Sequence, residues 1–369
     1  MIKSILIYLA NLFRIFSFFK EEVTLLCKID NIGDYILFRN FLKDFKGSEF
    51  NQNRKIVFVG NVAWKNIFET YDHSTIDKVI WVNLNTLQNN VLYRYGILFL
   101  LNTFRFHTIV QPTYSRNLLI DFLLLPLKAK FKYSPFGDDL NHIRELKLKN
   151  DQSYSHIIRS EKEIEFEFDR NLFFFRELDS VFANVKFSLP FERKKQKENE
   201  ISFFIGSSSK TRQFSRENLG HILKSINNQS HYRVNLLGGP AEFGIAEELS
   251  EISERVINLC GRLTLSETIN TIGNSKIVLT MDSSGLHMAM GTGVPKVYCF
   301  SNGNHAFRFV PYPKQYKNLT VFFPPIIEMA IGKHPKIVYD SFRNGSLIPI
   351  DSIRIDLAVK QILKGLRSE

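Results

Sequence analysis

Short runs of apolar residues alternate with longer stretches of helical periodicity along most of this chain. Apolar runs bounded by turn residues and separated by helical segments are typical of strands in a parallel sheet with crossover helices. In the first half, the pattern predicts a helix over 32–42, a helical stretch over 160–184, and strands over 23–29, 55–60, 79–82 and 108–111. In the second half, it predicts strands over 201–205, 233–237, 256–259, 276–280 and 296–300.

The alternation is interrupted between residues 190 and 200, where charged residues replace nearly all apolar ones. Such a segment is typical of a linker. The predicted fold is α/β, with two Rossmann-like domains facing a cleft at the carboxyl ends of their strands, where open α/β sheets bind ligands. The predicted segments are an N-terminal helix at 1–20, a first domain at 21–190, a linker at 191–200, a second domain at 201–345 and a C-terminal segment at 346–369. Within the last segment, the pattern predicts a helix over 351–366 with Asp351 or Ser352 as its N-cap.

The first twenty residues predict an amphipathic helix with a wide apolar face. Between residues 2 and 19 the polar positions fall within a sector of about 140° on a helical projection. No segment of the chain has the eighteen uninterrupted apolar residues of a spanning helix. Arg14 interrupts the apolar run and no small-residue cleavage site follows, which argues against a secretory signal. Two interpretations stay open: the helix lies in the interface of an anionic membrane, or it packs on the first domain.

Composition narrows the class of partner. The chain has 369 residues, 44% of them hydrophobic, and a net charge of +11, which favours a globular protein with an anionic partner. Nucleic acid is not expected, because zinc-finger spacing and basic blocks interleaved with aromatics are lacking. The three cysteines are widely spaced and form no CxxC pair, so the sequence predicts neither a disulfide framework nor a zinc site. A reducing, cytoplasmic location is therefore expected.

Three polar turns follow predicted strands of the second domain. The first, at 206–212, combines serine hydroxyls with Lys210 and Arg212 before a helix, a set of donors that could hold phosphate oxygens. The second, at 238–242, contains Gly239, which lets a ligand approach the backbone, and Glu242, which could accept hydrogen bonds from a ribose or an adenine amine. For each turn alone, an ordinary polar turn that caps a helix remains the alternative.

The third turn, at 282–295, is the most specific. Small residues form a tight junction between a strand and a helix, so the first N–H groups of that helix would face a pyrophosphate. Asp282 and His287 flank this junction. A helix-capping aspartate and a buried histidine are the alternatives for either residue alone. Three such turns at one edge of a sheet together predict a site for a nucleoside diphosphate.

These residues resemble the family 9 glycosyltransferases, which include the lipopolysaccharide heptosyltransferases, over nearly the whole chain. The block from Asp282 to His287 is similar to the family signature D-[ST]-G-x-x-H-x-A, although Gly285 stands one position later than usual. The other matching segments are Asn31-Ile32-Gly33-Asp34, the Gly-Ser-Ser turn at 206–208, Leu237-Gly238-Gly239-Pro240 with Glu242, Asn258-Leu259-Cys260-Gly261-Arg262 with Leu265 and Glu267, and Gly291-Thr292 with Pro295.

The resemblance implies a two-domain glycosyltransferase B fold, with the acceptor on the first domain and a nucleotide-sugar on the second. It also implies transfer with inversion and without a bound metal, and the sequence contains no Asp-x-Asp triplet. Asp34 falls at the position of the family's catalytic base. Arg212 stands where a Lys is usual and Phe214 where a Trp is usual. The expected donor-binding residues are Ser207, Ser208, Arg212, Gly239, Glu242, Asp282, Ser284, Gly285, Leu286 and His287.

The expected activity is therefore transfer of a sugar, with heptose from ADP-heptose favoured, to a glycan or glycolipid such as the lipopolysaccharide core. No cofactor beyond the donor is expected. The expected location is the cytoplasm, at the inner face of the cytoplasmic membrane if the N-terminal helix binds there. The alternatives are another nucleotide-sugar donor, or a nucleotide-sugar-binding protein without catalysis. Generic candidates for binding a phosphorylated acceptor are Lys28, Arg39, Arg105 and Arg116.

Overall fold

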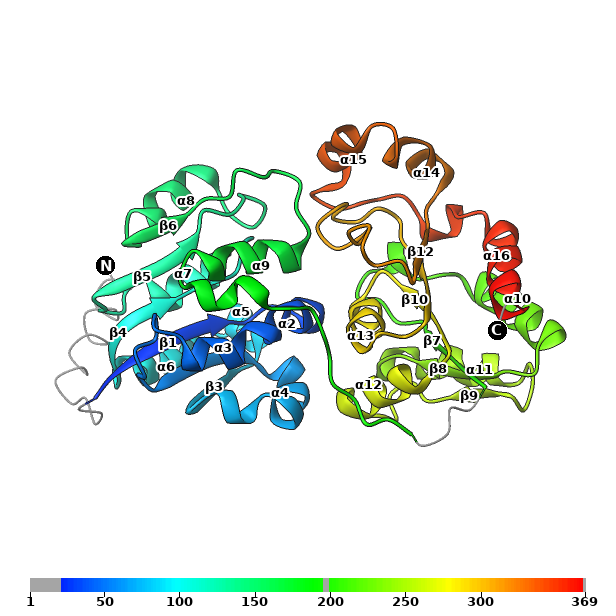
Figure 1. Ribbon diagram of the computed structural model, residues 1–369, viewed down its shortest axis with the longest axis horizontal. Helices are drawn as coiled ribbons and strands as arrows, with labels where there is room; N and C mark the ends of the chain where they lie inside the picture. The colour runs from blue at the N-terminus through cyan, green and yellow to red at the C-terminus, as the bar shows by residue number, and fades with distance from the viewer. Residues whose placement is uncertain (1–20, 195–198, 368–369) are drawn as a thin grey trace. The chain divides into compact units, whose positions relative to one another are not determined.

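A computed structural model describes residues 21–194 and 199–367. The chain forms two compact units (Figure 1). The first unit ends at Lys186, and the second contains the remainder together with a short piece, Ile164–Glu167, from within the first. The helix predicted at 1–20 lies outside the described residues. No helix in the described part of the chain combines the length and apolar composition that crossing a membrane requires.

The first unit is built on a six-stranded parallel sheet of order β3-β2-β1-β4-β5-β6. Its strands are β1 (Glu22–Lys28), β2 (Ile56–Asn61), β3 (Lys78–Val82), β4 (Arg105–Val110), β5 (Phe131–Pro135) and β6 (His156–Ile158). Its helices are α2 (Ile32–Phe38), α3 (Leu42–Gly47), α4 (Lys65–Tyr71), α5 (Leu84–Asn89), α6 (Val91–Asn102), α7 (Leu118–Leu124), α8 (Arg144–Asp151) and α9 (Glu167–Arg176), the last starting at the boundary of the units.

A cluster of phenylalanines joins helices of the first unit to one another. Phe41 of the short turn between α2 and α3 stacks on Phe175 of α9, with 4.8 Å between ring centres. Phe38 and Phe45 contact the same ring at 5.9 and 6.0 Å. Each aromatic side chain buries a large apolar area, so this cluster holds the helix that follows β1 firmly against α9.

The second unit repeats the architecture with a six-stranded parallel sheet of order β12-β11-β10-β7-β8-β9. Its strands are β7 (Glu200–Phe204), β8 (Arg233–Leu237), β9 (Val256–Asn258), β10 (Ile277–Met281), β11 (Lys296–Phe300) and β12 (Leu319–Phe322). Its helices are α10 (Arg216–Gln229), α11 (Phe243–Ser250), α12 (Leu265–Asn274), α13 (Ser284–Thr292), α14 (Pro325–Ile331), α15 (Pro335–Phe342) and α16 (Ile355–Arg367). The predicted pair of parallel α/β units is thus confirmed.

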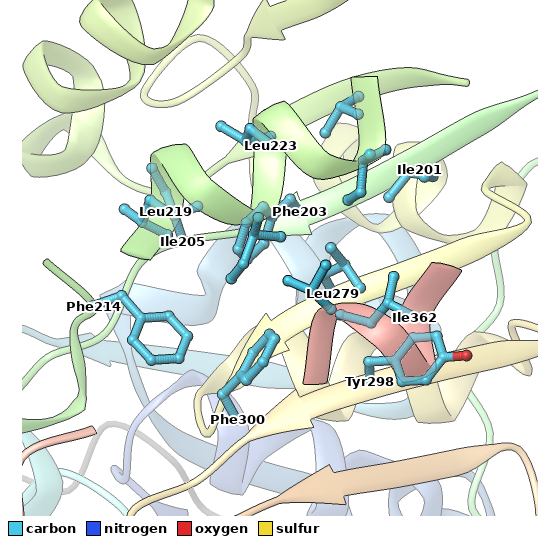
Figure 2. Packing of buried hydrophobic residues seen from close by; sticks show 14 of the residues in the cluster. Ile201, Phe203, Ile205, Phe214, Leu219, Leu223, Leu279, Tyr298, Phe300 and Ile362 are labelled. Carbon is cyan, nitrogen blue, oxygen red and sulfur yellow. The ribbon is translucent and has the colours of Figure 1, made fainter. Parts of the chain in front are cut away.

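One hydrophobic cluster of the second unit lies between this sheet and helices α10, α11 and α16. Figure 2 shows Phe203 of β7 and Ile205, just after that strand, among Leu219 and Leu223 of α10, with Ile362 of α16 in the same cluster. The apolar side of α16 is buried because its apolar residues recur at helical spacing, as the sequence predicts. Continuous burial of β10 explains why its five residues are all apolar or small.

The helix at the C-terminus starts later than predicted. A 3-10 turn occupies Ile350–Ser352, the chain then extends at Ile353, and α16 begins at Ile355. Asp351 does not cap this helix. Its carboxylate accepts hydrogen bonds from the backbone N–H of Ser215 (3.0 Å) and from the side chain of Asn218 (2.6 Å), at the start of α10. The fold brings donors at the start of α10 close to this carboxylate, and they bind it in place of the N–H groups of the C-terminal helix that the sequence predicts.

The segments around the unit boundary also differ from the sequence pattern. In the stretch 160–184, helical structure is limited to α9 and a 3-10 turn at Ser180–Asn184. The backbone of Glu167 donates to the carbonyl of Arg308, 2.8 Å away, which attaches the first residue of α9 to the second unit. Residues 187–194 also belong to that unit, because Asn270 and Asn274 of α12 bind the backbone of Glu192 and Lys194. Tertiary contacts here override the local pattern.

Candidate functional site

The three predicted turns follow β10, β7 and β8, which are consecutive neighbours near the middle of the second sheet (Figure 1). Because the strands are parallel, all three turns leave the sheet at its carboxyl edge. Ligands of open α/β sheets bind at this edge. The strand order therefore places the predicted donor residues side by side.

Arg212 joins the turn after β7 to the turn after β10. One terminal nitrogen of its guanidinium donates to the backbone carbonyl of Asp282 at 2.8 Å, and the other donates to Oγ of Ser208 at 2.8 Å. The side chain of Gln213 holds the same turn by donating to the carbonyl of Ser207 at 2.6 Å. The cation at position 212 is thus fixed between the two turns.

Three polar side-chain atoms of these turns are buried without a hydrogen-bond partner among the residues that the structure describes. They are the hydroxyls of Ser207 and Ser283 and Nε of Arg212. A buried polar atom left unpaired costs about 1–3 kcal/mol, so nearly all such atoms in proteins are paired. Each of the three can donate a hydrogen bond. Together they indicate a ligand rich in acceptor oxygens, as a diphosphate is.

Asp282 lies at the centre of the site with a buried carboxylate. Its Oδ2 accepts a hydrogen bond from Ser301 Oγ at 2.8 Å. Burial raises the pKa of Asp282 from 3.8 to about 6, and the charge of Arg212 and the Ser301 hydrogen bond oppose this rise. Ser301 follows β11 in a polar turn, a signal of the same kind as the three predicted turns, yet the sequence interpretation did not include it.

The helix that follows, α13, is close-packed against the sheet. A Cβ on Gly285 would approach the ring of Phe204 in β7 to 2.5 Å, so the helix start requires glycine at this position. Leu286 is fully buried and belongs to the core, and Ser284 is the first residue of the helix. Gly285 therefore brings the N–H groups at the start of α13 close to the turn after β7.

His287 is buried behind the turn rather than exposed at it. Its Nδ1 lies 2.6 Å from the hydroxyl of Tyr312, and its ring is next to Phe309. Burial lowers the pKa of His287 to about 3, which keeps the imidazole neutral at physiological pH. This histidine therefore brings no positive charge to a diphosphate, and its contacts hold α13 against the loop that carries Tyr312.

Glu242 lies between the turns after β7 and β8. Its Oε2 accepts a hydrogen bond from the backbone N–H of Gly239 at 2.9 Å. Added Cβ atoms at Gly206 and Gly238 would come within 3.2 and 3.0 Å of its side chain, so both glycines make room for it. The half-buried carboxylate gives this side of the site a negative charge suited to hydroxyl or amine donors.

In the first unit, Asp34 is the third residue of α2, at the carboxyl edge of the sheet. The loop that precedes it is fixed by side chains of the neighbouring β2–α4 connection. Asn61 Nδ2 donates to the carbonyls of Ile29 and Asp30 at 3.2 Å each, and the indole of Trp64 donates to that of Asp30 at 3.0 Å. The half-buried carboxylate of Asp34 is therefore carried on a rigid junction.

The four generic acceptor-binding cations do not form a surface for a phosphorylated glycan. Lys28, Arg39 and Arg116 are buried in ion pairs with Asp30, with Asp72, and with Asp121 and Asp151. Arg105 is the first residue of β4, at the amino edge of the sheet and away from the carboxyl edge. Carboxylates neutralise three of these cations. Asp72 and Asp151 lie 33 and 35 residues from their arginine partners, a pairing that the local sequence pattern does not show.

The raised pKa of Asp282 predicts that Asp282→Asn stabilises the protein in the absence of donor. Above pH 6 the carboxyl group of Asp282 is ionised in both states, but it ionises less readily in the folded state because its pKa is higher there. Ionisation of Asp282 therefore lowers the free energy of unfolding in this pH range. A pKa shift of this size corresponds to on the order of 2–3 kcal/mol. We expect Asp282→Asn to raise the free energy of unfolding by that amount at pH 8, and the gain to vanish as the pH falls from 6 to 4.

Urea unfolding at pH 4 to 8 measures this gain, with exposed Asp340→Asn as the control. If Asp282→Asn instead lowers the free energy of unfolding by the same amount at every pH, the raised pKa of Asp282 is contradicted. The carbonyl oxygen of the new amide can accept the same hydrogen bond from the hydroxyl of Ser301.

Across residues 21–194 and 199–367, no group of three or more His, Cys, Asp or Glu side chains is arranged to hold a metal ion.

The family model for glycosyltransferase family 9 (heptosyltransferase) matches residues 147–332, which include all three turns. No curated protein sequence matches the chain. The chain is similar to a solved family 9 glycosyl transferase from Veillonella parvula, with 15% identity, 94% of this chain and 98% of that chain covered, and a TM-score of 0.70.

Two solved structures from E. coli are also similar. Heptosyltransferase WaaC with ADP has 16% identity, a TM-score of 0.65, and coverage of 93% of this chain and 99% of its own. ADP-heptose lipopolysaccharide heptosyltransferase II has 12% identity, a TM-score of 0.56, and coverage of 81% and 89%. At identities this low, the structural similarity shows that the fold is shared and no more.

Proposed function

Because this chain belongs to glycosyltransferase family 9 and has the glycosyltransferase B fold, we propose that it transfers a heptose from ADP-heptose to a cell-surface glycan. The acceptor we propose is a hydroxyl of a growing glycan or glycolipid such as the lipopolysaccharide core. The single observation that carries the donor site is the set of unpaired donors on Ser207, Ser283 and Arg212. The ADP in the similar WaaC structure supports the choice of nucleotide.

In the proposed reaction, the acceptor oxygen attacks the anomeric carbon of the donor as the bond from that carbon to the diphosphate oxygen breaks. Asp34 takes the proton of the acceptor hydroxyl as general base. A single displacement of this kind inverts the anomeric centre and needs no second carboxylate as nucleophile. ADP leaves with the added negative charge.

The departing diphosphate needs hydrogen-bond donors already in place. Arg212 supplies a guanidinium whose orientation is fixed by Ser208 and the carbonyl of Asp282. Ser207 and the first N–H groups of α13 add neutral donors. Donors held before the reaction stabilise the developing charge without reorganising, which lowers the barrier. No metal ion is required in this proposal.

Thermal unfolding in the presence of nucleotide-sugars tests the donor. A ligand at about a hundred times its Kd stabilises the folded state by about 2.7 kcal/mol, which raises the melting temperature by several degrees. We expect ADP-heptose and ADP to give this shift, and UDP- and GDP-sugars to give none. A shift from a UDP- or GDP-sugar alone would identify a different donor.

The replacement of the usual Lys by Arg212 is the observation that favours the alternative, another nucleotide-sugar donor with the same chemistry. The same unfolding experiment separates the two proposals, because its readout is the identity of the ligand. Slow hydrolysis of the bound donor, measured by release of ADP, separates an enzyme from a protein that only binds nucleotide-sugars.

A further inference from the structure

An arginine and an aromatic ring lie together at the carboxyl edge of the first sheet, outside every site described so far. Phe136 directly follows β5, and Arg159 directly follows the neighbouring strand β6. The backbone N–H of Phe136 donates to the carbonyl of Ile158 at 2.7 Å, which holds the two strand ends side by side. The guanidinium carbon of Arg159 lies 3.6 Å from the centre of the Phe136 ring.

The surroundings of Arg159 differ from those of several other cations of the first unit. Lys28, Arg39 and Arg116 are buried and neutralised by carboxylates. Lys147 also lies over the Phe136 ring, but it is buried and paired with Asp151 at 2.9 Å. The side chain of Arg159 is exposed, and within the described ranges it makes no ion pair and no hydrogen bond.

Stacking on an aromatic ring limits the movement of a guanidinium group and leaves its N–H groups available to a ligand. The planar fork keeps five donors available at its edge, with less side-chain entropy to lose when a ligand binds. Carboxylates and phosphates fit this fork through two parallel hydrogen bonds. An exposed arginine prepared in this way is suited to binding an oxyanion on a partner molecule.

We propose that Arg159 binds an anionic group of the acceptor glycan, either a sugar phosphate or a sugar carboxylate. This inference rests on the proposed function, since it assigns the acceptor to the unit that carries Asp34. It deepens that function by stating the charge of the acceptor and the residue that recognises it. Phe136 acts as a positioning residue that orients the guanidinium.

Steady-state kinetics on three acceptors tests the proposal. The probes are deacylated lipopolysaccharide core oligosaccharide, the same material after phosphatase treatment, and the same material after chemical reduction of its carboxyl groups. We expect Arg159→Ala to raise the acceptor KM about ten- to a hundredfold on the untreated acceptor, the range for a lost charge-assisted contact. The kcat and the donor KM should stay close to native.

The treated acceptors identify the anion. On the acceptor that has lost the recognised group, native protein and Arg159→Ala should have the same KM. An equal effect of the substitution on all three acceptors, an unchanged acceptor KM, or a lower kcat with unchanged KM would overturn the proposal. Arg159→Lys should recover only part of the loss, because an ammonium keeps the charge but lacks the fork.

The chain offers a matched control at the opposite end of the same strand. Lys130 lies over the ring of Phe131, 5.2 Å from its centre, just before β5 begins. Lys130→Ala removes a stacked, exposed cation at the amino edge and should leave the acceptor KM unchanged. Phe136→Leu should raise that KM less than Arg159→Ala does, and thermal unfolding shows whether it remains folded.

Failure of this inference and failure of the proposed function give different results. If native protein transfers sugar and Arg159→Ala has the same acceptor KM, only the proposed role of Arg159 is wrong. If no nucleotide-sugar is transferred or hydrolysed, the proposed function is wrong. In that case calorimetric titration of native and Arg159→Ala protein with the untreated oligosaccharide still decides the binding role, which an equal affinity would overturn.

Discussion

Asp34→Asn is expected to lower turnover by about a hundredfold or more while donor affinity stays close to native. The amide has nearly the shape of the carboxylate but cannot take the proton of the acceptor hydroxyl. The side chain is half-buried on a rigid junction, so the substitution should not displace it. The measurements are kcat with saturating donor and acceptor, and calorimetric titration with ADP.

A purely structural role for Asp34 predicts a different outcome. A carboxylate in the first turn of a helix stabilises it by about 0.3–1 kcal/mol through the helix dipole. Asp44, in the first turn of α3, is a matched position and is also half-buried. We expect Asp44→Asn to change stability by a similar amount and to leave turnover at the native value. Native turnover in Asp34→Asn would exclude it as the base.

Arg212→Ala is expected to weaken binding of ADP about ten- to a hundredfold, the effect of losing a charge-assisted contact of about 1.5–3 kcal/mol. The side chain also joins Ser208 to the backbone of Asp282, so its loss frees both turns. Arg212→Lys should recover only part of the affinity, because a lysine cannot bond to both turns and to a phosphate at once. Calorimetry on ADP alone measures all three proteins.

Lys210 supplies the control for this prediction. It lies in the same 3-10 turn, Lys210–Arg212, and is exposed. Lys210→Ala removes an equal charge from the turn and should change ADP affinity less than threefold, as expected for an exposed, salt-screened charge. If Lys210→Ala weakens binding more than Arg212→Ala does, Lys210 is the cation that holds the diphosphate.

The sequence by itself determined five of the six strands of the second unit and the turns after three of them; β12 (Leu319–Phe322) was not predicted. Strands buried on both faces of a parallel sheet are rich in apolar residues, so 233–237 and 296–300 could be predicted with their observed bounds. The predicted turns, which follow β7, β8 and β10, are rich in glycine and serine because the backbone must bend and leave its N–H groups accessible. Strands with weaker patterns, such as β6 with three partly exposed residues, could not be predicted.

The tertiary structure alone decided which charged side chains are available to a ligand. Arg39 and Arg116 were candidates from the sequence, but their partners Asp72 and Asp121 neutralise them in the fold, whereas Arg159 was not a candidate and is exposed. Asp351 has a helix-capping signal, but its carboxylate binds Ser215, the N-cap residue of a helix 136 residues away. The reason is physical: the apolar pattern that forms strands and helices is local, whereas ion pairs and hydrogen bonds form with whatever group the completed fold places within reach.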